Sequence, residues 1–435
     1  MEGTVVYRLL LLLLLALGSG MSLAAPQTPV VYRIRVEGVI SPASAMYIGR
    51  GIREAHAAGA AALVVELDTP GGLLKSTDDI TKAILSSPVP VIVYVAPPGA
   101  RAASAGVFVV YAAHVAAMAP TTNLGAATPV SVGGAEQETE SQRTMLRKAT
   151  EDAVAKIRTL AKRRGRNAEW GERAVRQAAA LPSEEAVRMD VVDLLAGDVH
   201  ELLARVDGRT VEVLGSSRIL RTRGARVVDL GMDVREQFLD LLAEPNVGLI
   251  LMTVAIYGIL FELNNPGLVV PGVVGAIALI LALTSFAILQ VNYAGLALIA
   301  LGVALLMAEL FVPGFGVLGV GGIVAFILGG ILLTSNQEPY LRASVPLVVA
   351  LGLLTGGFFL FALGAGVRAQ RKRPVSGWES LVGRVGVAKT DVDGQGLVLV
   401  GGEDWSAESD EPVRAGERVR VVGVEGLRLR VRKEE

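Results

Sequence analysis

Apolar residues are distributed differently in three successive parts of this 435-residue chain. From residue 30 to 205, short apolar runs of strand length alternate with amphipathic segments of helical length. From residue 247 to 367 the apolar stretches are long and nearly uninterrupted, and after residue 376 short alternating segments are separated by glycines. Strands separated by helices predict βαβ units and a mainly parallel sheet for the first part.

The central part predicts about five membrane spans. A helical span needs about 20 residues, and the first apolar stretch is the shortest. Hydrophobic residues make up 52% of the chain and the mean hydropathy is +0.51, which is high for a soluble protein. The basic positions 368 and 371–373 follow the last stretch, so we expect the C-terminal end in the cytoplasm. The five stretches are residues 247–261, 268–289, 294–312, 315–333 and 345–367.

The N-terminus has the pattern of a secretory signal. Arg8 precedes the apolar run 9–17, and residues 22–24 resemble a small-residue cleavage site. An uncleaved anchor is the alternative, and both place the next segment outside the cytoplasm. An exported front and a cytoplasmic tail require an odd number of spans, which five satisfies. The predicted organisation is a signal at 1–25, an α/β domain at 26–235, a membrane domain at 236–368 and a small C-terminal domain at 369–435.

The membrane part contains an internal repeat. Glu262 followed by Pro266 and Gly267 recurs as Glu309 followed by the dipeptide at 313–314. We interpret the repeat as two tandem helix hairpins whose small residues allow close helix contact. The glutamates are either interfacial residues at helix ends or buried carboxylates used for partner contact or transport. Since the two hairpins (residues 247–333) have only these two carboxylates and no buried basic residue, we do not favour a transporter.

Residues 376–435 predict a small all-β barrel of OB type. Strands are expected at 382–388, 396–400, 418–422 and 427–432, with a hairpin turn at 423–426. The segment has two tryptophans, no other aromatic residue and more acidic than basic residues. Binding of single-stranded nucleic acid needs stacking aromatics and a basic groove. The net charge of −1 gives no support either, so we expect no nucleic-acid partner.

Composition limits the chemistry. The chain has no cysteine, which excludes disulfides, cysteine-bound metals and thiol nucleophiles. The three histidines are His56, His114 and His200. We expect His114 on the helix that follows position 104, pointing away from that position, and the other two lie at early and late positions of the domain. A histidine-based triad is therefore disfavoured, and neither a metal nor a cofactor is expected.

A tight turn at Ser104 is the most informative feature of the α/β part. Residues 97–106 follow a buried strand and lead into a helix, which predicts an exposed hydroxyl beside backbone N–H groups. Residues 68–72 end the preceding strand and should lie beside it. The N–H groups of Gly71, Gly72 and Ala105 are candidate donors to an oxyanion. From these residues alone, a helix start made of small residues for packing stays an alternative.

Several separated motifs in this order resemble the NfeD family of membrane-bound ClpP-class serine proteases. They are residues 66–72, 97–106, 165–167, 265–267 and 313–316. The resemblance covers nearly the whole chain and implies a ClpP/crotonase-like α/β domain with a Ser–Lys dyad. It makes Ser104 the nucleophile and, counting back from residues 160–161, Lys148 the general base. It also implies hydrophobic peptide substrates, a stomatin-like membrane partner and a homo-oligomer.

Periodicity does not select the lysine independently. A lysine base must be largely neutral, which burial favours. If residues 141–164 form one regular helix, Lys156 lies nearer the buried face than Lys148. Lys148 fits if the helix begins late or if a second subunit covers it. The expected buried face consists of Met145, Ala149, Ala153, Ile157 and Leu160.

The resulting hypothesis is a multi-pass cell-membrane serine endopeptidase with an extracytoplasmic protease domain. A loop at 125–140 is expected near its site. The alternative is a non-catalytic scaffold that uses a protease-like fold to organise partners, because a fold alone does not establish activity.

Overall fold

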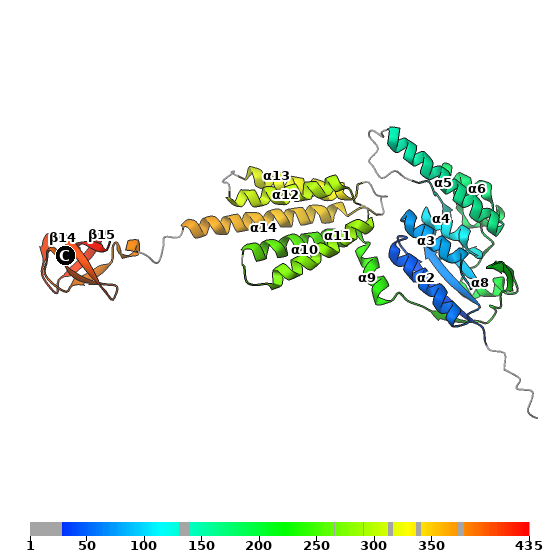
Figure 1. The fold of residues 1–435 in the computed structure, drawn as a ribbon, viewed down its shortest axis with the longest axis horizontal. Helices are drawn as coiled ribbons and strands as arrows, with labels where there is room; N and C mark the ends of the chain where they lie inside the picture. The colour runs from blue at the N-terminus through cyan, green and yellow to red at the C-terminus, as the bar shows by residue number, and fades with distance from the viewer. Residues whose placement is uncertain are drawn as a thin grey trace, which may run out of the picture. The chain divides into compact units, whose positions relative to one another are not determined.

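The computed structural model describes residues 28–129, 140–264, 266–289, 291–311, 316–335, 341–371 and 378–434. The predicted signal at 1–25 lies outside these residues, as do positions 130–139 of the predicted loop. Figure 1 labels the main elements.

A six-stranded parallel sheet forms the centre of the α/β domain, in the order β11-β1-β2-β3-β5-β8. The prediction of a mainly parallel sheet is therefore confirmed. β-branched residues dominate the central strand β3, all five of whose residues are buried. The strands are β1 (Val30–Glu37), β2 (Ala62–Asp68), β3 (Val91–Val95), β5 (Val115–Met118), β8 (Leu194–Leu195) and β11 (Arg226–Asp229).

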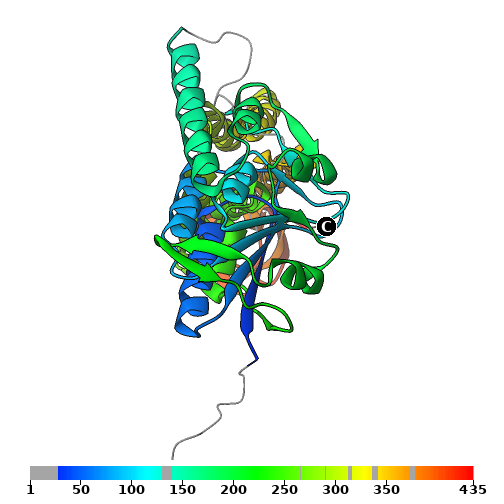
Figure 2. The ribbon, with the colours of Figure 1, turned by 90° about the vertical axis from the view of Figure 1, so that its right-hand side faces the viewer.

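Alternate side chains of this sheet enter two separate cores, as a strand's period of two requires. Val65 and Val93 pack into the core beneath α2 (Pro42–Ala57), α3 (Leu74–Leu85) and α4 (Ala105–Ala112). Val64 and Tyr94 pack into the core beneath α8 (Val199–Val206) and the hairpin of β9 (Thr210–Val213) and β10 (Ser216–Ile219). Figure 2 shows the sheet between these two layers.

A second, three-stranded sheet of very short strands carries the segment before Ser104. Its order is β4-β6-β7, with β4 parallel to β6 and β6 antiparallel to β7. The strands are β4 (Arg101–Ala103), β6 (Asn123–Gly125) and β7 (Ala180–Pro182). The remaining helices of the domain are α5 (Glu140–Arg164), α6 (Ala168–Arg176), α7 (Ser183–Arg188) and α9 (Val234–Leu242). The boundary placed at 235/236 thus falls inside α9.

Five apolar helices follow in the described residues: α10 (Pro245–Asn264), α11 (Val270–Leu289), α12 (Tyr293–Phe311), α13 (Val317–Leu333) and α14 (Val345–Arg371). Two contain apolar segments long enough to cross a membrane, Pro245–Leu263 and Val270–Leu289, and the other three have shorter ones. The first helix, α10, is therefore longer than the apolar stretch 247–261 indicated, because it continues through Glu262.

The repeated glutamates cap helices. The Glu262 carboxylate accepts hydrogen bonds from the N–H groups of Gly267 and Val269, both at 3.2 Å. The Glu309 carboxylate accepts from Gly316 at 2.9 Å and from Gly319 at 3.1 Å. Each carboxylate thus satisfies N–H groups at the start of the next helix, where negative charge is favoured. This capping role accounts for the glutamate of the repeat without a transport function.

Close helix contact through glycine is confirmed. A Cβ on Gly275 would lie 2.7 Å from the backbone of Ile259, and one on Gly258 would lie 2.6 Å from the Pro271 carbonyl. A Cβ on Gly302 would lie 2.7 Å from the Gly322 carbonyl. Larger residues would push the paired helices apart.

The C-terminal segment forms a closed five-stranded barrel in the order β12-β13-β14-β16-β15, which confirms the OB-like prediction. Its core is built largely of valine. Two details differ: the turn falls at Gly426, after β15, and the long strand β14 was not predicted because its outward residues are acidic. The strands are β12 (Val385–Ala388), β13 (Val392–Val400), β14 (Glu403–Val413), β15 (Arg418–Glu425) and β16 (Arg428–Lys433).

Candidate active site

Ser104 occupies a strained turn at the start of α4. Its φ of 49° and ψ of −112° lie in a region that residues with a Cβ rarely adopt. The residue sits at the N-cap position, yet its side chain makes no capping hydrogen bond to the helix. Among the described residues, the hydroxyl has no hydrogen-bond partner. A serine forced into this conformation directly before a helix resembles the turn that presents nucleophiles in α/β hydrolases.

Main-chain hydrogen bonds on both sides hold the turn. The Ser104 N–H donates to the Ala126 carbonyl at 2.8 Å, just after β6. The Ala103 N–H donates to the Thr69 carbonyl at 3.0 Å, and the Thr69 N–H donates to the Arg101 carbonyl at 2.7 Å. Thr69 also forms an isolated parallel bridge with Ala102. The prediction that residues 68–72 lie beside the serine turn is confirmed.

Two glycines allow the chain segments to approach each other. A Cβ on Gly106 would lie 2.7 Å from Thr69 Cγ2 and 3.1 Å from the Ala102 Cβ. A Cβ on Gly72 would lie 2.3 Å from the carbonyl oxygen of Ile40. Since real Cβ atoms do not make contacts this short, the small residues around the turn are a packing requirement as well as a candidate feature of the site.

The three candidate oxyanion donors differ in what they contact. The Gly71 N–H donates to Thr69 Oγ1 at 3.0 Å, and Gly71 has a φ of 125° that favours glycine. The N–H groups of Gly72 and Ala105 have no acceptor among the described residues. Gly71 therefore shapes the loop through an internal hydrogen bond, while the other two N–H groups are available.

Arg166 holds the opposite end of α4. This buried guanidinium donates through Nη1 to the carbonyls of Tyr111 at 3.0 Å and Ala113 at 2.9 Å. Its Nη2 donates to Asp193 Oδ2 at 2.9 Å, and the same carboxylate accepts the Ala116 N–H. The interaction satisfies carbonyls at the helix C-terminus, where positive charge is favoured. The sequence showed Arg166 only as part of the 165–167 motif and gave no signal of this role.

The three histidines lie in different parts of the α/β domain. His114 lies after the end of α4, not on it as expected, because the helix ends at Ala112. Its Nδ1 accepts the Val91 N–H at 3.2 Å. Burial, reinforced by nearby arginines, lowers the pKa of His114 to about 3. His56 and His200 are exposed on α2 and α8.

The first half of α5 is not packed on the domain as predicted. Met145 is 73% exposed and Lys148 is also exposed, whereas burial along the helix begins at Ala153. The expected buried face is therefore wrong before residue 153 and correct from there to Leu160. The first turns extend beyond α6 (Figure 1). No hydrogen bond joins Lys148 to Ser104 within the described part of the chain.

The alternative lysine has other partners. Lys156 Nζ forms an ion pair with Asp78 of α3 and lies 5.5 Å from the centre of the Phe108 ring on α4. Its ammonium is thus engaged between α3 and α4.

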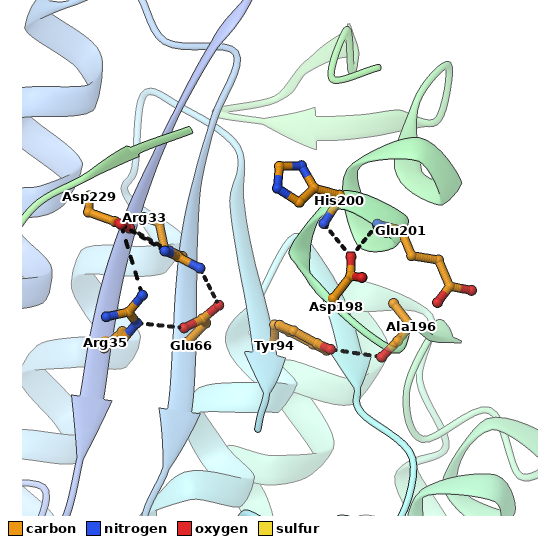
Figure 3. A network of polar contacts seen from close by, with 9 residues as sticks. All are labelled: Arg33, Arg35, Glu66, Tyr94, Ala196, Asp198, His200, Glu201 and Asp229. Carbon is orange, nitrogen blue, oxygen red and sulfur yellow. Dashed lines mark hydrogen bonds and ion pairs between the residues drawn. The ribbon is translucent and has the colours of Figure 1, made fainter. Parts of the chain in front are cut away.

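A cleft of about 370 Å³ lies on the other face of the sheet, beside α8. Its two arginines form ion pairs: Arg33 contacts Asp229 at 2.7 Å and Glu66 at 3.2 Å, and Arg35 contacts Glu66 at 3.1 Å (Figure 3). This network joins β11, β1 and β2.

Beside this network, the Tyr94 hydroxyl donates to the Ala196 carbonyl at 2.7 Å. Burial raises the pKa of Tyr94 to about 12, with nearby carboxylates adding to the effect. Since these groups satisfy each other, the cleft has the character of a structural network. The described residues contain no cluster of potential metal ligands.

The structure therefore combines a parallel α/β domain that carries the serine turn, a set of apolar helices and a closed C-terminal barrel. Three family models match: the N-terminal domain of NfeD1b over residues 30–208, the NfeD integral membrane domain over 246–365, and the NfeD-like C-terminal, partner-binding domain over 379–433. The chain belongs to the NfeD family.

Relatives match along almost the whole chain. Membrane-bound protease PH1510 of Pyrococcus horikoshii is 34% identical, with 93% of each chain covered. The membrane protein NfeD1b of Bacillus subtilis is 28% identical, with 94% of each covered. A solved P. horikoshii structure, described as a membrane protease specific for a stomatin homologue, shares 30% identity over 49% of this chain and 98% of its own, with a TM-score of 0.43.

Proposed function

We propose that the protein is a membrane-anchored serine endopeptidase in which Ser104 is the nucleophile and Lys148 is the general base. The observation that carries the proposal is the strained Ser104 turn, whose hydroxyl makes no hydrogen bond among the described residues and is followed directly by the Ala105 N–H, which has no acceptor among them. Membership of a family with a protease 34% identical over nearly the whole chain supports it.

The proposed chemistry follows from these positions. The Ser104 hydroxyl attacks the peptide carbonyl, while the Lys148 amine accepts its proton and returns it to the leaving amine. The N–H groups of Gly72 and Ala105 stabilise the oxyanion, with Gly71 shaping their loop. A water molecule then hydrolyses the acyl-enzyme. We prefer Lys148 to Lys156 because the latter is held by Asp78.

As the proposed base, Lys148 requires a cover that the described residues of one chain do not supply. A lysine base must lose its charge, and removal from water favours the neutral form. Because Lys148 is exposed in the described structure, we propose that a second copy of the chain or a bound substrate covers the first turns of α5. A homo-oligomer is the natural source of such a cover.

The substrate we propose is an apolar peptide segment of a stomatin-like membrane protein. The P. horikoshii protease is described as specific for a stomatin homologue, and the family model names the C-terminal domain as partner-binding. In this proposal the α/β domain lies outside the cytoplasm and the barrel lies inside.

Ser104→Ala tests the proposal in the full chain, reconstituted in liposomes. Cleavage of an apolar peptide should fall by about 10⁴-fold or more, and labelling by a fluorophosphonate should disappear. Ser86→Ala is the matched control, because Ser86 is an exposed serine at the end of α3. Equal cleavage by Ser104→Ala would overturn the assignment. Failure of the unmodified protein to cleave or to be labelled would favour the scaffold hypothesis.

A further inference from the structure

We propose that α9 is an interfacial helix whose exposed apolar face inserts into the bilayer surface next to α10. Its partner on this face is lipid, and its insertion sets the orientation of the α/β domain on the membrane.

The apolar residues of α9 face outward. Val234 is 83% exposed, Phe238 is 45% exposed and Leu241 is 55% exposed. Their spacing of four and then three residues places them on one stripe of the helix. On another side of the same helix, the charged residue Glu236 is only 1% exposed. A helix of a soluble domain would show the opposite arrangement, with its apolar stripe inside and its charge in water.

The helix cannot rotate to hide this stripe. Glu236 accepts hydrogen bonds from Arg50 of α2, at 2.9 Å from Nε and 2.7 Å from Nη2. Glu236 also forms a capping box with Asp233, with N–H to carboxylate distances of 2.8 and 2.9 Å. Rotation would break a nearly buried ion pair and the helix cap together, which is costly. The outward position of the stripe is therefore fixed by α2.

The chain enters the membrane immediately after α9. Helix α9 ends at Leu242 and α10 begins at Pro245 with an apolar segment long enough to span. Only Ala243 and Glu244 lie between the two helices, and three Cα–Cα steps extend over at most about 11 Å, so α9 cannot lie far from the bilayer surface. The stripe is thus continuous with a membrane-spanning segment, and lipid is the apolar material within its reach.

The segment that precedes α9 is tied to the α/β domain along its length. Strand β11 pairs with β1, and its last residue, Asp229, contacts Arg33 at 2.7 Å. The next carbonyls, of Leu230 and Gly231, accept hydrogen bonds from Tyr47 and Arg50. Because α9 is joined rigidly to the domain, insertion of its stripe fixes how the domain stands on the membrane.

Charge distinguishes this mode of membrane binding from attraction to anionic headgroups. Within residues 233–244, Asp233, Glu236, Asp240 and Glu244 are acidic and only Arg235 is basic. Such a segment gains nothing from anionic lipid. Its insertion should therefore be driven by apolar contact and should not depend on salt.

Because the sequence has no cysteine, a single introduced cysteine can be spin-labelled without removing any native residue. Single variants Val234→Cys, Phe238→Cys and Leu241→Cys would carry a nitroxide in the full chain, reconstituted in phosphatidylcholine vesicles. Controls are Arg235→Cys on the same helix and Ser217→Cys on the exposed strand β10. Collision with oxygen, which enters lipid, is compared with collision with a water-soluble nickel chelate.

Oxygen should dominate at the three stripe positions, with depths of about 5–10 Å, and the nickel chelate should dominate at Ser217. The Arg235 label should be shallower than its neighbours, and addition of salt should leave all depths unchanged. If collisions with the nickel chelate dominate at the stripe, the stripe faces water and the proposal is wrong. Low collision rates with both reagents would overturn it in favour of a protein partner. Because the labelled side chains are exposed, unchanged thermal unfolding is expected and checks that each variant is folded.

Discussion

The two halves of the proposed dyad are held very differently. The Ser104 turn is fixed by main-chain hydrogen bonds to Thr69 and Ala126, and the far end of its helix is held by Arg166. Lys148 lies in the first turns of α5, where Met145 is also exposed. Burial along that helix begins only at Ala153. Contacts within one chain therefore hold the turn of the proposed nucleophile in place. The position of the base depends on whatever covers the first turns of α5, so catalysis would be coupled to assembly or substrate binding.

After Ser104→Ala, the largest expected effect comes from removing the proposed base. Lys148→Ala should lower the cleavage rate by about 10²–10⁴-fold, the range that a positioned acid–base group contributes. Thermal stability should hardly change, because the side chain is exposed and packs against nothing described. Peptide cleavage and the unfolding temperature of the full-length protein in detergent measure the two effects.

Lys156→Gln is the matched control for that variant. It breaks an ion pair with Asp78 whose side chains are 26% and 41% exposed, so a stability loss of at most about 1 kcal/mol is expected. Cleavage should stay within a few-fold of the unmodified protein. A large loss of cleavage in Lys156→Gln with full activity in Lys148→Ala would reverse the assignment of the base.

A substitution at the far end of α4 should lower both the stability of the domain and the rate of cleavage. Arg166→Met removes the guanidinium that binds the carbonyls of Tyr111 and Ala113, and it leaves Asp193 with the Ala116 N–H and a longer contact to Arg209 at 3.8 Å. Breaking a buried pair in this way should cost about 3 kcal/mol. Denaturant unfolding measures the loss, and cleavage should fall because α4 carries Ser104 at its other end.

Arg163→Met provides the comparison for the same change of side chain. Its exposed contact with Glu212 at 3.3 Å should contribute less than about 1 kcal/mol. If both arginine variants lose the same stability, the buried network at the end of α4 is not what supports the serine turn.

A larger residue at Gly72 should disturb the loop beside the serine turn, because no space is left for a Cβ. Gly72→Ala places a Cβ within 2.3 Å of the Ile40 carbonyl oxygen, so the loop must shift, at a cost of about 1–3 kcal/mol. Because the same residue supplies a proposed oxyanion donor, the fall in kcat should exceed any change in KM. Gly49→Ala in the middle of α2, where a Cβ meets only the end of Arg53, should stabilise slightly. Unchanged kcat in a folded Gly72→Ala protein would remove Gly72 from the oxyanion site.

The sheet and the serine turn could be predicted from short stretches of sequence, because runs of buried β-branched residues and the small residues around Ser104 are visible there. The strands β4, β6 and β7 were missed because each has three residues and exists only through non-local pairing. The repeat showed Glu262 and Glu309, but their capping role depends on backbone groups of the following helix. The face of α5 was wrong at Met145 because periodicity assumes that a helix packs along its whole length.

The last prediction concerns acid, to which the buried serine half and the exposed first turns of α5 should respond differently. His114 is neutral in the folded protein because burial lowers its pKa to about 3, whereas a histidine in the unfolded chain has a pKa of about 6.5. Between these values the unfolded chain binds one more proton than the folded one. Stability from this group is therefore complete above pH 6.5 and is lost as the pH falls towards 3, by up to about 1.4 kcal/mol per pH unit.

His114→Asn keeps an acceptor for the Val91 N–H but does not titrate, so the decline of stability below pH 6.5 should become shallower. Hydrogen exchange resolves where the effect acts. Amides of α4 and β5 should lose protection on acidification in the unmodified protein and lose less in the variant. The exposed first turns of α5 should show the same exchange in both proteins, because no described contact links them to His114. If the stability of the two proteins falls equally with decreasing pH, the buried imidazole does not control the acid response of the serine half.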